Sequence, residues 1–277
     1  MDNKIVADSC CDLNPEIEEN VNIDLVPLTM RIEDTEFVDD SSFDQQAYIQ
    51  AMKKSKYAPK TSCPSVHDFL ERLKEAKNSY VVTLSAKLSG TYNSAMQAKE
   101  LVLEELSDRF IHVFDSQSAS VGETLISLKI HEYIQANLKN LEIVEKVNKY
   151  IKEMKTFFVL ENMDNLAKAG RLNPLIAKAA SFLSIRPIMG EKDGEIRLVD
   201  KVRGHERALK RMIEVIGEEG SRFEERVLAI AHCNCLQRAL DFKKRVMEKY
   251  SFKDVIVVET AGISTTYAND GGLIIAF

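Results

Sequence analysis

Short apolar runs alternate with longer segments of helical spacing over about the first 155 residues of the chain. Residues Ile23–Ile32 alternate with a period of two and predict one exposed or edge strand. Strands that alternate with helices indicate right-handed βαβ units and a mostly parallel sheet. The other predicted strands are Lys4–Ala7, Tyr80–Leu84 and Ile111–Phe114, and the predicted helices are Val66–Ala76, Tyr92–Leu106 and Ser118–Leu138.

The pattern changes in the second half of the chain. Residues Ile185–Met189 and Glu195–Val199 flank a Gly-containing turn and predict a hairpin. We therefore expect a first α/β lobe over residues 1–155 and a second over 156–277, joined in one domain. The remaining predicted strands are Phe157–Leu160, Arg226–Ala231, Val255–Val258 and Leu273–Ala276, and the remaining predicted helices are Met163–Gly170, Pro174–Leu183, Glu206–Ile216 and Leu236–Tyr250.

The charge of the chain argues against nucleic acid as a partner. The 277 residues carry 37 Lys and Arg and 43 Asp and Glu, a net charge of -6, whereas nucleic-acid and membrane surfaces attract basic proteins. No apolar run reaches the roughly 18 residues that a membrane span needs, and the amino-terminal residues do not resemble a secretory signal. Five Cys residues, an odd number, favour free thiols. We expect a cytoplasmic protein without membrane insertion.

Common catalytic and cofactor motifs are missing from the sequence. It has no Gly-x-Gly-x-x-Gly, no phosphate-binding loop and no Gly-x-Ser-x-Gly. The segment His232–Cys235 comes closest to a metal cluster, but it lacks a second ligand pair and is interpreted as a strand end with a buried thiol. A disulfide between the adjacent Cys10 and Cys11 would be strained, so a small-residue loop is favoured there. No cofactor and no metal are expected.

Hydroxyl-rich loops remain as candidates for chemistry. They follow predicted strands or lead into predicted helices, in the region where open α/β sheets bind ligands. One such loop is explained by helix capping, but several together also provide hydroxyl donors, backbone N–H groups and helix dipoles for one anion. Without a Lys-rich phosphate cradle, a carboxylate is the anion expected. The four loops are Asp8-Ser9, Thr61–Ser65, Ser85–Thr91 and Asp115–Ser118.

These loops, in this order, resemble motifs of the DegV family of fatty-acid-binding proteins. The resemblance covers essentially the whole chain, and its most specific element is Leu88–Ala95. It implies a two-lobed α/β fold, with a mostly parallel sheet in the first lobe, a mixed α/β second lobe and a ligand tunnel between them. The other matching segments are Asp8–Leu13, Thr61–Ser65, Val113–Gly122, Leu166–Leu172 and Val202-Arg203.

The resemblance also implies a ligand and its contacts. A long-chain fatty acid of the palmitate, stearate or oleate class would place its carboxylate on Thr61 and Ser89. The chain would then be a non-enzymatic lipid carrier in fatty-acid transport or metabolism. A charge-assisted hydrogen bond contributes roughly 1.5–3 kcal/mol, and a sixteen-carbon tail on the order of 10 kcal/mol before ordering costs. Polar loops would fix the register of the acid, and the apolar lining would set its affinity.

The sequence departs from the family pattern near its carboxyl end. The family commonly has a His in a Gly-Thr-His-x-Gly-Pro-Gly stretch, whereas this chain reads Gly262–Gly272 without His. Tyr267 and Asn269 are the residues there that could replace its hydrogen bond. In relatives that serve a fatty-acid kinase, a separate subunit phosphorylates the bound carboxylate beside that His. Its absence weighs against a kinase partner more than against lipid binding.

Two other functions are open at this point. A serine hydrolase or acyltransferase would use Ser89 as its nucleophile and would need a base, for which His67 and His112 are available in the first lobe. A regulator that senses lipid through the same cleft would need no catalytic residue. The carrier is preferred because neither His lies in a segment typical of a catalytic base.

Overall fold

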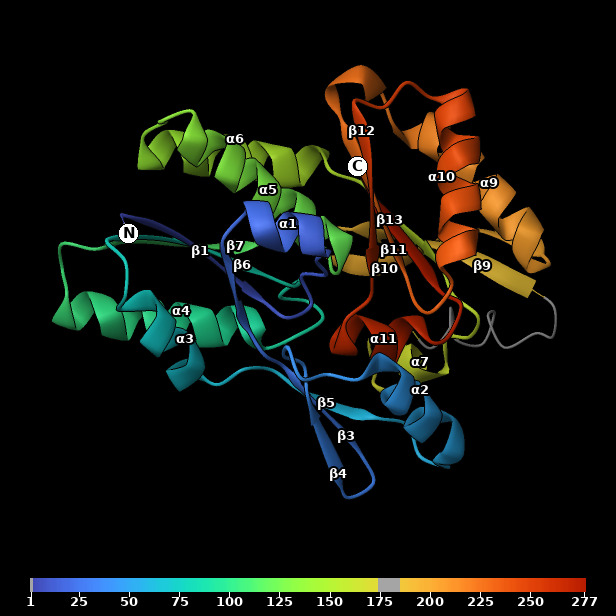
Figure 1. Ribbon diagram of the computed structural model, residues 1–277, viewed down its shortest axis with the longest axis horizontal. Helices are drawn as coiled ribbons and strands as arrows, with labels where there is room; N and C mark the ends of the chain where they lie inside the picture. Colours follow the sequence, from blue (N-terminus) through green and yellow to red (C-terminus); the bar gives the residue numbers. More distant parts are fainter. Residues whose placement is uncertain (1, 174–184) are drawn as a thin grey trace.

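A computed structural model of the chain describes residues 2–173 and 185–277 (Figure 1). The first sheet contains β1 (Asn3–Asp8), β2 (Ile23–Val26), β6 (Asn78–Thr83) and β7 (Phe110–Asp115), all parallel, in the order β2-β1-β6-β7. This confirms the parallel sheet predicted for the first half of the chain. The predicted helix Pro174–Leu183 lies outside the described residues.

Helices cover both faces of this sheet, as Figure 1 shows. Because successive strand residues point to opposite faces, Val6 packs with α3 (Val66–Leu73) and α4 (Thr91–Glu105). Ile5 packs instead with α5 (Val121–Gln135) and α6 (Asn140–Glu153). A short helix, α1 (Pro15–Asn20), joins the same second cluster through Ile17. The alternation of apolar residues along β1 therefore builds two cores.

The second sheet is mixed. Its order is β10-β9-β8-β13-β11-β12; β11 and β12 are parallel and the other neighbours are antiparallel. The predicted hairpin is confirmed as β9 and β10. Two helices, α9 (His205–Glu219) and α10 (Leu236–Lys249), cover one face, and a 3-10 turn, η1 (Phe223–Glu225), precedes β11. The strands are β8 (Thr156–Val159), β9 (Ile185–Lys192), β10 (Glu195–Arg203), β11 (Val227–His232), β12 (Asp254–Glu259) and β13 (Leu273–Ala276).

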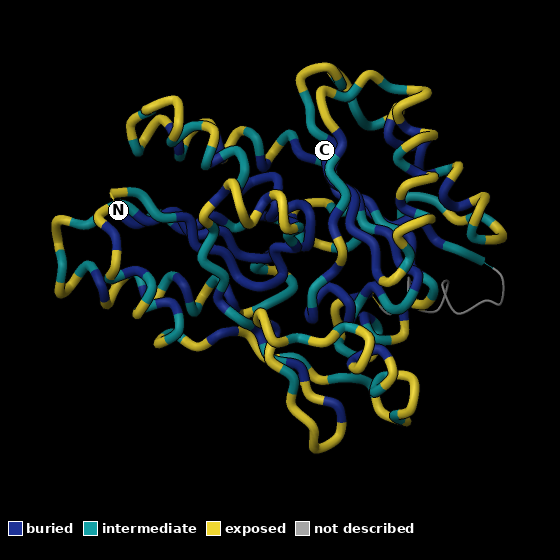
Figure 2. Tube along the Cα trace, viewed as in Figure 1, coloured by how far each residue is buried: buried dark blue, intermediate teal, exposed yellow. Residues whose placement is uncertain are grey.

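Helix α5 lies between the two large sheets. Its Leu125 and Ile126 belong to one buried cluster with Ile5 of the first sheet and Ala229 and Ala276 of the second. Figure 2 shows the resulting concentration of buried backbone at the centre of the molecule. The two halves of the chain thus share a core, and this core fixes the position of one sheet relative to the other.

A third, small antiparallel sheet corrects one prediction. Residues Ile23–Ile32 are not one strand: β2 ends at Val26, and β3 (Thr29–Ile32) pairs with β4 (Thr35–Val38) and β5 (Lys60–Ser62). Pro27 separates them because it has no N–H to donate to a ladder, and the N–H of Leu28 bonds the Ser9 hydroxyl instead. Packed against this sheet are α11 (Gly262–Ala268) and, through Tyr48, α2 (Gln45–Lys54); α7 (Asp164–Lys168) contacts α11.

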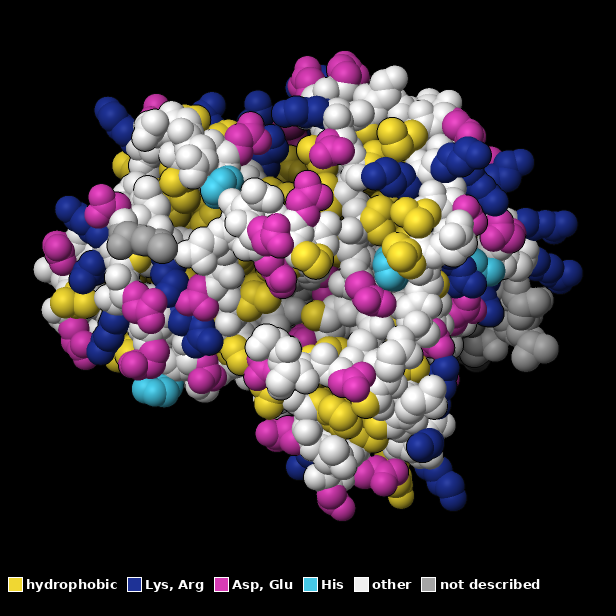
Figure 3. Space-filling view, viewed as in Figure 1, with side chains coloured by type: hydrophobic (Ala, Val, Ile, Leu, Met, Phe, Trp, Pro, Cys, Tyr) yellow, Lys and Arg dark blue, Asp and Glu magenta, His cyan; other side chains and the backbone are white. Residues whose placement is uncertain are grey.

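The surface carries charges of both signs, as expected from the similar numbers of basic and acidic residues in the sequence. Figure 3 shows Lys and Arg side chains interspersed with Asp and Glu over the face turned to the viewer. Among the described helices, none has the length and apolar content needed to cross a bilayer.

Candidate functional site

A cavity of about 410 Å³ lies between the two large sheets, with α11 in its wall. This volume falls within the range typical of small-molecule sites. Most of its lining is apolar and comes from both halves of the chain, so neither half forms it alone. The apolar lining residues include Leu28, Leu84, Leu88, Ala119, Phe158, Leu160, Leu166, Ile196, Ile263, Ala268 and Ile274.

Thr61 lines this cavity from β5. It pairs with Met30 of β3, and its hydroxyl lies 2.9 Å from the phenol oxygen of Tyr267 on α11. The sequence placed Thr61 in a loop, and this is wrong: the residue belongs to a short strand of the third sheet. A strand position holds the side chain more rigidly than a loop would. Tyr267 also lines the cavity, whereas Asn269 is not among its lining residues.

Ser89 lines the cavity from the loop between β6 and α4. The N–H of Ser89 bonds the Ser85 carbonyl, and the Ser89 hydroxyl lies 2.8 Å from that of Thr91, the first residue of α4. Ser89 also accepts the Thr91 N–H at 3.3 Å. The predicted helix start near Thr91 is therefore confirmed. It directs the positive end of the α4 dipole toward the Ser89 loop.

Close packing joins the Thr61 strand to the Ser89 loop. A Cβ placed on Gly90 would lie 3.3 Å from the sulfur of Cys63, two residues after Thr61. Gly90 permits this approach because it has no side chain. The structure therefore brings together the two segments that the sequence selected, although 28 positions separate Thr61 from Ser89.

Among the described residues, the cation that lines the same cavity is Arg171. Arg171 donates from Nε to the carbonyl oxygen of Leu88 at 3.1 Å, directly beside Ser89. Glu191 lines another part of the wall, and burial raises the pKa of its carboxyl. The Ser118 and Thr156 hydroxyls, 2.7 Å apart, satisfy each other in the wall. Thr156 belongs to the otherwise apolar strand β8, so no hydroxyl-rich pattern marks it in the sequence.

In two of the four predicted anion-binding loops, the Asp side chain holds backbone N–H groups instead of lining the cavity. Asp8 and Ser9 are buried and are not among the lining residues. Asp8 accepts the N–H groups of Cys10 and Leu84, and these two residues do line the cavity. Asp115 likewise accepts the N–H groups of two neighbouring loop residues, Ala86 and Gln117. Carboxylates at these strand ends hold the backbone of the wall from behind. The Asp side chains are not among the lining residues, whereas Gln117 and Ser118 of the fourth loop do line the cavity.

The Ser89 hydroxyl has no basic partner in the described structure. Its hydroxyl contact is with Thr91. His67 is exposed on α3, and His112 packs against Phe114, where burial lowers its pKa to about 4. Neither His forms the hydrogen bond that would activate a serine nucleophile, so the geometry gives the hydrolase alternative no support.

The cysteine interpretations are confirmed. Cys10, Cys11 and Cys233 are buried free thiols. Burial raises the pKa of Cys233 to about 11, and the residue directly follows β11, as expected for a thiol at a strand end.

The chain resembles known proteins over its whole length. A family model described as an uncharacterised protein of the DegV family matches residues 2–277. A DegV domain-containing protein of Streptococcus pneumoniae is 34% identical over 99% of this chain and 98% of its own.

Solved structures of similar proteins contain fatty acids. A DegV family protein from Ruminococcus gnavus, refined with vaccenic acid, is 43% identical, covers 99% of both chains and has a TM-score of 0.96. One from Eubacterium eligens, loaded with heptadecanoic acid, is 30% identical over 99% of this chain and 98% of that one, with a TM-score of 0.92. The Fatty Acid Kinase B3 protein of S. pneumoniae, loaded with linoleic acid, is 34% identical over 100% and 99%, with a TM-score of 0.93. By sequence and by structure, this chain belongs to the DegV family.

Proposed function

We propose that this protein binds one long-chain fatty acid in the cavity between its sheets, with the carboxylate on the hydroxyls of Thr61 and Ser89. The observation that carries the proposal is that both residues line a single, mostly apolar cavity. Similar proteins hold vaccenic, heptadecanoic and linoleic acids, which share an acid head group and a long apolar tail. Acids of the palmitate, stearate and oleate class have the same two features.

Three further groups support a carboxylate at this position. Tyr267 contacts the Thr61 hydroxyl and occupies the carboxyl-terminal segment in which the family commonly has its His. Arg171 supplies a positive charge beside Leu88 and Ser89. The amino terminus of α4, which has no acidic residue in its first turn, adds a favourable dipole. A neutral head group would gain less from each of them.

The apolar wall supplies most of the affinity. At about 0.8 kcal/mol per buried methylene, the tail outweighs the head group, whose hydrogen bonds contribute about 1.5–3 kcal/mol net. Burial of the tail against Leu84, Phe158 and Ile274 hides it from water. The head-group contacts then decide which way round the acid lies.

We propose a carrier rather than an enzyme. Ser89 has no base among the described residues, so the site binds the acid without the means to transform it. A kinase partner is a narrower proposal, supported by the similarity to the Fatty Acid Kinase B3 protein alone. The missing carboxyl-terminal His weighs against that partner, and the carrier function does not depend on it.

Native mass spectrometry and calorimetry test the carrier function. After removal of bound lipid, the protein should take up one palmitate or oleate per chain. Thr61→Ala and Ser89→Ala should weaken binding while the midpoint of urea unfolding stays near that of the wild type. Matched controls are Thr35→Ala on β4 and Ser107→Ala beyond the far end of α4, both exposed and outside the cavity. Failure to bind any acyl chain would refute the proposal.

A further inference from the structure

Four carboxyl groups lie buried behind the cavity wall: Asp8, Asp12, Asp39 and Glu123. None of them forms an ion pair with a Lys, Arg or His residue of the described chain. A buried carboxylate without a counter-charge is costly unless hydrogen bonds or a proton compensate it. The neighbours of each carboxyl group therefore show whether hydrogen bonds or a proton compensate its charge.

Hydrogen-bond donors compensate the three Asp residues. Asp39 accepts from the Ser9 hydroxyl and from two N–H groups at the start of α11, those of Gly262 and Ile263. Asp12 accepts the Ser120 hydroxyl and the N–H of Ala261.

Asp8 accepts the N–H of Cys10 at 3.0 Å on one oxygen and that of Leu84 at 2.8 Å on the other. Both donor residues line the cavity. The carboxylate of Asp8 thus ties together two segments of the wall, the loop after β1 and the end of β6.

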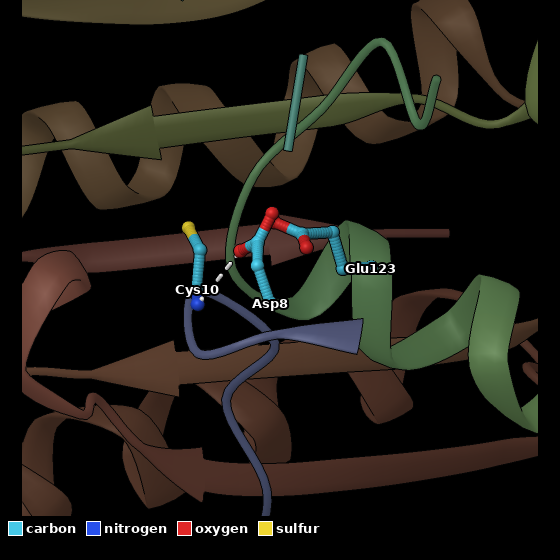
Figure 4. Close-up of side chains that lie close together, drawn as sticks. All are labelled: Asp8, Cys10 and Glu123. Carbon is cyan, nitrogen blue, oxygen red and sulfur yellow. Dashed lines mark hydrogen bonds between the residues drawn. The ribbon is translucent and has the colours of Figure 1, made fainter. Parts of the chain in front are cut away.

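Glu123 is the exception. Both of its carboxyl oxygens are buried, and no backbone N–H, hydroxyl or cationic group of the described residues donates to either; the donor beside them is the weak S–H of Cys10. Its side chain comes from the first turn of α5 and points at Asp8, so that the two carboxyl groups meet, as Figure 4 shows. Two carboxylates in contact in a dry interior cannot both be ionised.

We propose that Asp8 and Glu123 share one proton, carried by Glu123, and that this makes Glu123 a positioning residue for the cavity wall. As a neutral acid, Glu123 donates its O–H to Asp8 and so gains the strong hydrogen-bond partner that it otherwise lacks. Above its own pKa of about 7, Asp8 is ionised and keeps its bonds to the N–H groups of Cys10 and Leu84. Loss of the proton would place a second negative charge against Asp8 and push the carboxylate from the wall that it holds.

A divalent cation would also neutralise the cluster, since Asp8, Cys10 and Glu123 have ligand atoms within 4.8 Å of one another. The hydrogen bonds favour the proton. Both oxygens of Asp8 already accept backbone N–H groups, and the Cys10 sulfur accepts the N–H of Ser120 at 3.3 Å. A cation would need lone pairs from all three ligands, two of which already accept N–H groups, whereas the O–H of a protonated Glu123 needs only one further lone pair, on Asp8.

The charges around Glu123 also favour its protonated form. The titratable groups that face it are Asp8, Cys10, Cys11 and Asp12, all acids. Burial, and then Asp8, raise the pKa of Glu123 well above its ordinary value. A raised carboxyl pKa in the folded state means that stability is lost as the pH rises toward it. This wall support does not depend on which ligand the cavity binds.

Carbon-13 NMR of the wild-type protein, labelled at the Glu side-chain carboxyls, tests the protonation directly. One Glu signal should keep the chemical shift of a protonated acid at pH 7, and it should be missing from Glu123→Gln. Spectra in which every Glu carboxyl is ionised at pH 7 would overturn the proposal. Because the wild type itself is measured, this test holds even if a variant fails to fold.

The positioning role needs a second readout at the wall. The Cys10 and Leu84 amide resonances should move between pH 7 and 9.5 in the wild type and in the control Glu132→Gln, an exposed acid on the same helix. In Glu123→Gln that movement should fall at least twofold, because a neutral amide cannot lose the proton. Equal movement in both variants would contradict the role.

Two further measurements complete the test. Asp8→Asn removes the anion next to Glu123, so the Glu123 signal should ionise at a lower pH than in the wild type. A signal that titrates unchanged would count against the shared proton. Metal analysis of the purified wild type should find no stoichiometric divalent cation; a bound metal that is lost in Glu123→Gln would replace the proton by a metal site.

Discussion

The hydroxyl of Thr61, on a short strand near the first sheet, lies 2.9 Å from the phenol oxygen of Tyr267, on the last helix of the chain. Residues 206 positions apart therefore meet at the cavity. Either oxygen can donate in this contact. When a carboxylate accepts the Thr61 proton, Tyr267 can donate to Thr61 in turn, which keeps both hydroxyls paired.

Tyr267→Phe should therefore weaken fatty-acid binding without abolishing it. The loss of one neutral hydrogen bond contributes about 0.5–1.5 kcal/mol, or roughly two- to tenfold in Kd. Calorimetric titration with oleate measures the change. Tyr57→Phe, which changes an exposed Tyr, is the matched control. An affinity equal to that of the wild type would show that Tyr267 does not contribute to head-group binding.

The carboxylate assignment predicts discrimination between an acid and an alcohol. The fatty alcohol of equal length should bind more weakly by about 1.5–3 kcal/mol, roughly ten- to hundredfold, because it carries no charge for Thr61, Ser89 and Arg171. In the double variant Thr61→Ala/Ser89→Ala that gap should narrow, since the variant removes contacts made to the charge. Competition of each ligand against a fluorescent fatty acid gives the difference in affinity between acid and alcohol, in the wild type and in the double variant. An alcohol as tight as the acid would contradict the assignment.

Much of the architecture follows from local patterns. Most strands of the two large sheets are short, apolar runs between polar residues, and such runs are visible in sequence. The exception is β10, whose charged residues alternate with apolar ones and which was found through its hairpin turn. Helix α11 is different: Ser264, Thr265 and Thr266 are all buried, so it has no polar face and no helical periodicity to detect. Its packing against α2 and β3 makes it a helix that only the tertiary structure explains.

The site was predictable in part. Thr61 and Ser89 stand in hydroxyl-rich segments whose composition indicated an anion, and the structure places both in one cavity. The route by which they meet was not predictable, because Pro27 diverts the chain into a third sheet that carries Thr61 on β5. Glu123 was missed because a charged residue in the first turn of a helix normally indicates solvent exposure and a favourable dipole contact. Nothing local reveals that this one is buried against Asp8.

Gly122 precedes Glu123 and supports the cavity wall in another way. A Cβ at this position would lie 2.0 Å from the hydroxyl oxygen of Ser118 and 2.6 Å from its Cβ, so Gly122→Ala must displace the loop that lines the cavity. Overpacking of this kind typically costs about 1–3 kcal/mol. Urea unfolding should show that loss, and Gly217→Ala, whose added Cβ has the end of the Tyr250 side chain as its nearest neighbour, provides a comparison. A stability equal to that of the wild type would show that the loop adjusts freely.

The buried Asp residues predict how stability depends on pH. Burial, the largest cause in each case, raises the pKa of Asp8 and Asp12 to about 7 and that of Asp39 to about 6, from an ordinary value of 3.8. The folded chain therefore holds protons that the unfolded chain has released. The free energy of unfolding should fall as the pH rises from about 4 through 6–7, opposite to the usual behaviour of carboxylates in ion pairs.

Urea unfolding at pH 4, 5, 6, 7 and 8 measures this slope. Asp39→Asn should flatten it most between pH 4 and 6, because an amide has no proton to lose there. Asp40→Asn is the matched control, since Asp40 is exposed and its hydrogen bonds with Ser42 lower its pKa. Stability that rises from pH 5 to pH 8 would mean that the backbone and hydroxyl donors around the Asp side chains outweigh their burial. These donors, four of them on Cys10, Leu84, Ser120 and Ile263 of the cavity wall, would then hold fully ionised carboxylates.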